Sequence, residues 1–101
     1  MSISSIERRS AWYDLFDERG KKTKTLPSSI GEVKGFGYDF FVVNKSAWLD
    51  LYDENGRKYK TLPNSIGEVI SVSSTGFSVR RSAWIDTYDK YGKKINTRPA
   101  R

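Results

Sequence analysis

The chain has 101 residues, a formal net charge of +6, and neither cysteine nor histidine. These absences exclude disulfides and thiolate metal sites, and they remove the usual general base at neutral pH and the commonest metal ligand. Hydrophobic residues make up 37% and aromatic residues 14% of the chain, so much of the apolar surface belongs to Trp, Tyr and Phe, which favour strands. We therefore expect a small all-β protein that is not an enzyme and has no cofactor or metal ion.

The N-terminal residues MSISSIERRS contain no apolar stretch long enough for a signal peptide. No later segment approaches the roughly 20 apolar residues that cross a bilayer. We therefore expect a soluble cytoplasmic protein that does not associate with membranes.

A string of related sequence occurs three times. It reads SAWYDLFDERGKKTKTLP at 10–27, SAWLDLYDENGRKYKTLP at 46–63 and SAWIDTYDKYGKKINTRP at 82–99. Residues 8–43 and 44–79 are identical at 20 of 36 positions. A period of 20 to 50 residues indicates an array of one supersecondary unit. We predict a single domain, 1–101, with units at about 1–27, 28–63 and 64–101; the first unit lacks the IGEV segment that precedes the other two strings.

Each unit has a β pattern. The string around Trp48, Asp50 and Tyr52 alternates, which places these three side chains on one face and the residues between them on the other. The Asp-x-x-Gly stretch at 53–56 predicts a hairpin turn, and Pro63 should end the returning strand. GEVISV and GFSVRR have the character of two further strands. We therefore predict about four strands per unit and little or no helix.

The strand order GEVxxV, FxVxx, AWxDxYD, KxxTL resembles a short four-stranded blade of a β-propeller. It is also similar to bacterial Trp-containing β-repeats with an Asp-x-x-Gly-Lys turn. Propellers typically have four to eight blades, so three units could close a six-blade ring as a homodimer. A trefoil-like barrel within one chain is the alternative. In either case the strand missing from the first unit could come from the other terminus or from a partner.

Equivalent aromatic residues form the first candidate site. One hypothesis is a ligand-binding aromatic face that stacks on sugars or nucleobases. The other is a core layer, which we favour because the chain is poor in Leu and Ile. The candidate residues are Trp12, Trp48, Trp84, Tyr52 and Tyr88.

Three aspartates, Asp14, Asp50 and Asp86, lie between these aromatic residues in the alternating pattern. They could form a ring that binds a cation or an Arg-rich partner. The favoured interpretation is local pairing, because a buried carboxylate needs a partner. The expected partners are the basic residues before each Ser-Ala-Trp, namely Arg9, Lys45 and Arg81, or a backbone amide of a turn.

Basic residues concentrate in the third unit. Residues 80–101 contain seven Lys or Arg against two acids. This excess favours a polyanion-binding patch, although Lys on exposed strands also deters aggregation. The candidate residues are Arg80, Arg81, Lys90, Lys93, Lys94, Arg98 and Arg101.

These patterns predict a non-enzymatic module that binds a protein partner or its own copies through strand edges and Asp-x-x-Gly turns. The alternatives are a nucleic-acid-binding protein that uses the third unit and a protein that binds glycans or small ligands on its aromatic faces. Catalysis by the aspartates is the remaining interpretation and the least favoured.

Overall fold

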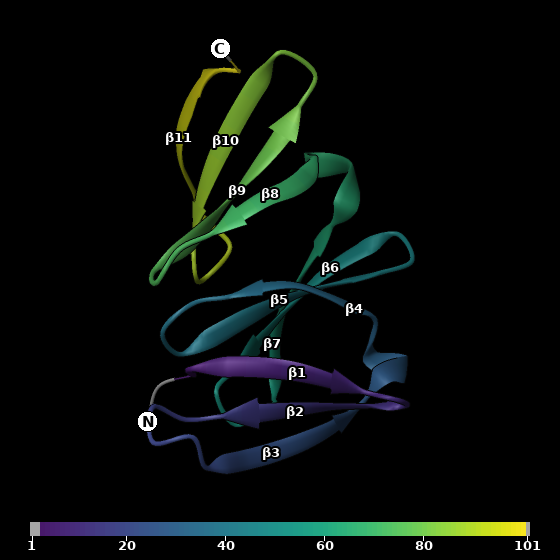
Figure 1. The fold of residues 1–101 in the computed structure, drawn as a ribbon. Coiled ribbons are helices and arrows are strands. Elements are labelled where there is room, and N and C mark those ends of the chain that lie inside the picture. The colour runs from purple at the N-terminus through teal and green to yellow at the C-terminus, as the bar shows by residue number, and fades with distance from the viewer. Residues whose placement is uncertain (1–2, 101) are drawn as a thin grey trace.

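The computed structural model describes residues 3–100, which form three antiparallel sheets stacked in a row (Figure 1). The first sheet contains β1 (Ser5–Arg9), β2 (Trp12–Phe16) and β3 (Lys22–Pro27). The middle sheet contains β4 (Glu32–Phe36), β5 (Phe40–Lys45), β6 (Trp48–Asp53) and β7 (Lys58–Pro63). The last sheet contains β8 (Glu68–Val72), β9 (Gly76–Arg81), β10 (Trp84–Asp89) and β11 (Lys94–Pro99). The prediction of an all-β fold made of three copies is confirmed.

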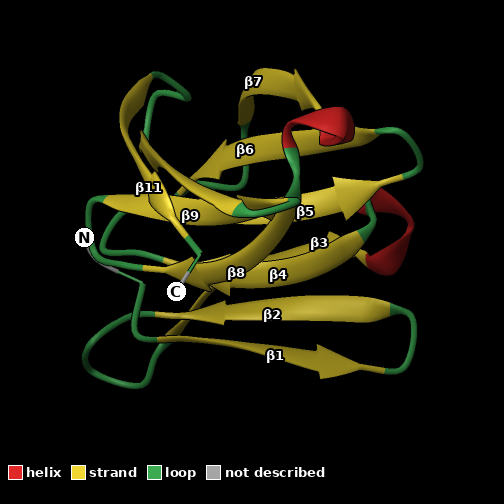
Figure 2. Cartoon of the chain, turned by 90° about the horizontal axis from the view of Figure 1, so that it is seen from above, coloured by secondary structure: helices red, strands yellow, loops and turns green. Residues whose placement is uncertain are grey.

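Within each sheet the strands are neighbours in chain order. The first sheet has three strands because its copy of the repeat lacks the IGEV segment, so β1 is an edge strand. Short 3₁₀ turns, η1 (Ser28–Ile30) and η2 (Asn64–Ile66), lead from one sheet to the next. Figure 2 shows these two turns as the helical segments, and strands make up most of the rest of the chain.

The Asp-x-x-Gly hairpin turns form as predicted. The Asp17 carboxylate accepts hydrogen bonds from the backbone N–H groups of Arg19 and Lys21, each at 2.9 Å. Asp53 and Asp89 accept the corresponding pairs of bonds. The glycine of each turn has a positive φ, between 77° and 84°, a conformation that glycine adopts without strain. The aspartate side chain and the glycine together determine the conformation of this turn in all three copies of the repeat.

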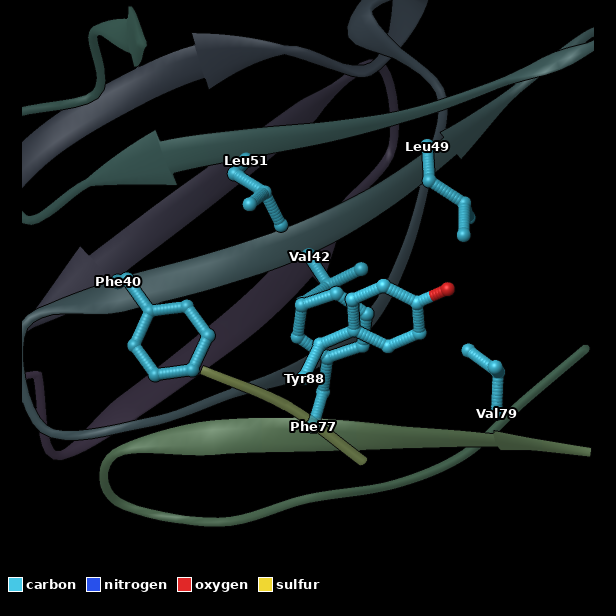
Figure 3. Packing of buried hydrophobic residues seen from close by; sticks show 7 residues of the cluster. All are labelled: Phe40, Val42, Leu49, Leu51, Phe77, Val79 and Tyr88. Carbon is cyan, nitrogen blue, oxygen red and sulfur yellow. The ribbon is translucent and has the colours of Figure 1, made fainter. Parts of the chain in front are cut away.

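The middle sheet packs against a neighbouring sheet on each of its faces, and successive side chains of β6 point alternately to the two neighbours. Leu49 and Leu51 face the last sheet, where they pack with Phe77 and Val79 (Figure 3). On the opposite face, Tyr52 packs in the cluster shared with the first sheet. The predicted alternation along this strand is therefore confirmed. The two clusters of buried residues are Phe40, Val42, Leu49, Leu51, Phe77, Val79 and Tyr88, and Ile3, Leu15, Leu26, Phe41, Val43 and Tyr52.

The middle and last sheets approach most closely at their first strands, β4 and β8. A Cβ atom built on Gly35 would lie 2.6 Å from a methyl carbon of Val72, so only glycine permits this approach. The described residues form three separate sheets, and neither a closed ring nor a closed barrel is seen among them. No helix in residues 3–100 is long and apolar enough to cross a membrane.

Candidate functional site

All three tryptophans lie at the surface. Trp12, Trp48 and Trp84 are 45%, 50% and 45% exposed, although Trp is usually among the most buried residues on average. The core interpretation is therefore wrong for the tryptophans. Each one is the first residue of the second strand in its hairpin, directly after a Ser-Ala turn.

The Ser-Ala turns explain this position. In each copy the two strands are joined by two residues, and the serine has a φ between 52° and 57°. A positive φ at the first central position matches the twist of a tight hairpin, although Ser adopts it less readily than Gly. Figure 1 shows the turns of the first and middle sheets at the right of the stack and the turn of the last sheet at its top. The three tryptophans that follow these turns are here called the Trp rim.

The cross-strand neighbours of the Trp rim are also repeated. On one side each Trp pairs with a basic residue, which is Arg9 for Trp12. On the other side it pairs with the proline that ends the third strand, which is Pro27 for Trp12. Directly opposite residues of an antiparallel pair share a face. Each copy therefore places a cation, an indole and a proline side by side; the other two sets are Lys45, Trp48 and Pro63, and Arg81, Trp84 and Pro99.

The aspartate two positions after each Trp is buried and paired. Asp14 is 5% exposed, accepts a hydrogen bond from the Arg9 guanidinium at 3.0 Å and accepts another from the Thr25 hydroxyl at 2.9 Å. The Arg9 bond, aided by the Thr25 bond, lowers the pKa of the Asp14 carboxyl, while its burial opposes this change. The local-pairing hypothesis is correct here.

Asp86 follows the same design, with hydrogen bonds from Thr97 at 2.8 Å and Arg81 at 3.2 Å. The Thr97 bond is the largest cause of its lowered pKa. Asp50 lies 3.9 Å from the ammonium group of Lys58, just as Asp86 lies 3.9 Å from that of Lys94. The cation paired with Asp50 is Lys58 and not Lys45, so the expected partner of Asp50 is wrong. Lys58 reaches Asp50 from the neighbouring strand β7, a proximity that the order of residues along the chain does not reveal.

The aspartates do not form a shared ring. Each has its own partners within its own sheet: the hydroxyl that bonds to Asp50, for example, belongs to Thr61 of the same sheet, at 3.0 Å. The hypothesis of three convergent carboxylates that bind one cation is not supported by this arrangement.

Tyr52 and Tyr88 belong to the core. They are 8% and 7% exposed and stack on Phe41 and Phe77 with ring centroids 5.0 and 5.3 Å apart. The structure thus divides the predicted aromatic set into buried tyrosines and exposed tryptophans. Only the tryptophans remain available to a ligand.

The basic residues of the third unit do not form one patch of unpaired charge. Arg81 and Lys94 both approach Asp86, and Lys90 pairs with Asp39 at 2.8 Å across two sheets. Of the remaining candidates, Arg80, Lys93 and Arg98 are exposed, and Arg101 lies outside the described residues.

A second surface feature lies at the Asp-x-x-Gly end of the strands. A cavity of about 230 Å³ is lined by Asp39, Asp53, Tyr59, Lys90 and Tyr91. The Tyr59 hydroxyl donates to the backbone carbonyl of Lys90. Burial, with the Asp39 charge as a smaller cause, raises the pKa of Tyr59 to about 12. These contacts join the middle and last sheets, so we assign this feature to the packing of the repeats.

Comparisons with protein-family models, with curated proteins and with solved structures found no match to this chain.

Proposed function

We propose that this protein is a non-enzymatic binding module that contacts a partner protein through the Trp rim. The observation that carries this proposal is the half-exposed indole kept at the same place in three copies of the repeat. A side chain of this size buries roughly 150–250 Å² when fully covered, so the three half-exposed indoles offer about 300 Å² of contact. One contact that covered all three indoles would match the size of the contiguous apolar patches that are often functional on monomeric proteins.

The residues beside each Trp support a protein partner. Trp and Arg are the residue types that contribute most at protein interfaces, usually near the centre of the contact. Indoles also supply a rigid contact with little loss of side-chain entropy. A stable interface needs about 800 Å² on each partner. The Trp rim would therefore be the centre of a contact that includes the neighbouring cations and prolines.

Nucleic acid is the second candidate partner, through the exposed Arg80, Lys93 and Arg98. We favour the protein partner because other cations of the third unit are paired with carboxylates. The cytoplasmic location expected from the sequence stays a prediction.

The test is a selection of displayed random peptides on the immobilised protein. We expect selected peptides to lose at least tenfold in affinity against Trp48→Ala, the effect of a hot-spot residue. They should also protect the indoles from quenching by acrylamide. Tyr38→Ala and Tyr91→Ala are matched controls, because these tyrosines are 61% and 64% exposed but lie at the other end of the strands. The selected peptides should bind both control variants as tightly as they bind the wild type.

Peptides that bind a triple Trp→Ala variant as well as the wild type would contradict the proposal. A salt-dependent affinity for single-stranded oligonucleotides that disappears in Arg80→Ala/Lys93→Ala/Arg98→Ala would favour the nucleic-acid alternative instead. Circular dichroism of each variant would show that the fold is retained.

A further inference from the structure

A cavity of about 270 Å³ lies between the middle and last sheets. Leu49, at the start of β6, forms one of its walls, and Gly67 and Val69, around the start of β8, form another. The remaining lining residues are Lys34, Asn44, Asn64 and Glu68. The internal repeat permits this cavity to be compared with the equivalent place between the first and middle sheets.

Between the first and middle sheets, a tyrosine side chain fills the space that corresponds to this cavity. Tyr13 of the first sheet is 5% exposed and extends to the start of β4 in the middle sheet. Its hydroxyl donates to the Gly31 carbonyl at 3.1 Å and accepts from the Val33 N–H at 3.4 Å. The Arg8 guanidinium lies over its ring, 5.7 Å from the centroid.

The two places correspond through the repeat of 36 residues. Leu49 stands where the first copy has Tyr13, and Asn44 stands where it has Arg8. Gly67 and Val69 likewise correspond to Gly31 and Val33, the residues that bond to the tyrosine hydroxyl.

Replacing Tyr by Leu removes most of a ring and its hydroxyl, and the cavity lies beside Leu49, which is itself buried. A cavity of about 150 Å³ is enough to hold benzene, so the cavity beside Leu49 is large enough for a phenol ring. Its lining has an apolar part, Leu49 and Val69, and a polar part. In the polar part the Asn64 amide donates to Asn44 and to the Ser46 carbonyl, and Lys34 pairs with Glu32.

We propose that this cavity binds a phenol ring that enters from solvent and takes the place that Tyr13 takes between the first two sheets. The hydroxyl of the ligand would lie at Gly67 and Val69, with the ring against Leu49. The ligand is either a free small phenol or a tyrosine side chain of a peptide. This site is separate from the Trp rim, and the proposal does not depend on the function of that rim.

The probe is p-cresol, which is the tyrosine side chain without its backbone, titrated into the ¹⁵N-labelled protein. We expect shifts of the amide resonances of Gly67 and Val69. Toluene has the same shape without the hydroxyl, so it should bind about three- to tenfold more weakly, the effect of one neutral hydrogen bond. Equal shifts with both probes, or shifts confined to residues away from the cavity, would overturn the proposal.

Two exchanges of residues between the repeats test the site further. Leu49→Tyr gives the middle sheet the residue of the first sheet, fills the cavity and should abolish p-cresol binding. Tyr13→Leu makes the opposite change and should add a second site, with new shifts at Gly31 and Val33. If Leu49→Tyr does not fold, Tyr13→Leu still decides the matter, because a folded variant with no second site would contradict the proposal.

A second probe, N-acetyltyrosine amide, distinguishes a free small phenol from a tyrosine side chain of a peptide as the ligand. If it shifts the same resonances as p-cresol, the site accepts a tyrosine within a peptide. If only p-cresol binds, the site accepts a free phenol. Binding of neither probe would overturn the proposal.

Discussion

The middle sheet and the two end sheets share one repeat, but their faces differ where a neighbouring sheet is present or absent. On the face toward the last sheet, the middle sheet has Val42 and Leu51, both fully buried. At the same positions on its own outward face, the last sheet has Ser78 and Thr87, whose hydroxyls lie 3.3 Å apart. The outward face of the last sheet therefore has two hydroxyl side chains where the inner face of the middle sheet has two aliphatic side chains.

The first sheet shows the same difference on its outward face. The middle sheet has Phe41 and Val43 where it meets the first sheet, and both are fully buried. The first sheet has Ser5 and Glu7 at these positions. Terminal units of a repeat array need a polar outer face for solubility. The comparison therefore indicates that both outer faces of the three described sheets are suited to solvent, which argues against a ring closed by stacking these faces between two chains.

The largest expected effect comes from giving the middle sheet a residue of the last sheet. Leu51→Thr should lower the free energy of unfolding by about 2–4 kcal/mol, because it removes buried apolar volume and buries a hydroxyl. Thr87→Ala is the matched change on the outward face and should cost no more than about 1 kcal/mol. Urea denaturation measures both. Similar losses in the two variants would mean that the two faces are equally buried in solution.

The reverse exchange should change the mass in solution. Ser78→Val/Thr87→Leu gives the outward face of the last sheet the pair found in the middle sheet, and exposed apolar patches promote association. We expect light scattering to show the wild type as a monomer of 11.6 kDa and the variant as dimers or larger species. A wild-type dimer at low concentration would contradict the argument from the outward faces.

Acid should destabilise the protein by protonating buried aspartates, which occur on inner and outward faces alike. Hydrogen bonds hold the pKa values of Asp14 and Asp86 below the usual 3.8. Their contribution to stability is complete above that value and is lost as the pH falls through the lower folded pKa, because the unfolded chain binds protons first. Asp86→Asn should therefore flatten the acid side of the stability profile relative to the wild type. Glu32→Gln serves as the surface control, and an equal change in both variants would refute the assignment.

The smallest effect concerns the junction of the middle and last sheets. The pKa of Tyr59 is raised to about 12, mainly by burial. Between the ordinary pKa of 10.0 and this value, the unfolded chain loses the proton first, so stability should decline as the pH rises. Ultraviolet titration should show one tyrosine that ionises late and is absent from Tyr59→Phe. A wild-type titration identical to that of the variant would show that the phenol is not held at this junction.

Much of the fold could be predicted from the sequence, because it depends on local patterns. The alternation around Trp48, Asp50 and Tyr52 gave the two faces of the strand, and the Asp-x-x-Gly stretches gave the hairpin turns. The exposure of the tryptophans could not be predicted, because alternation gives the face of a residue but not its distance from the end of the strand. Trp48 and Tyr52 share a face, yet only Tyr52 lies under the neighbouring sheet.

Other features had no local signal. The Ser-Ala turns require a positive φ at Ser46 and its equivalents, but Ser is not a residue type that indicates this conformation. The pairing of Asp50 with Lys58 depends on the register between strands. The cavity beside Leu49 became visible only when two interfaces between sheets could be compared.

The tryptophans lie at the surface of the folded array, whereas Tyr52 and Tyr88, on the same strand faces, lie in its core. The most direct measurement is quenching of tryptophan fluorescence by acrylamide in the native protein at low concentration. We predict efficient quenching and an emission maximum between those of buried and fully solvated indoles, with similar values for three variants that each retain a single Trp. Blue-shifted emission that acrylamide does not quench would place the indoles in the core and contradict the account.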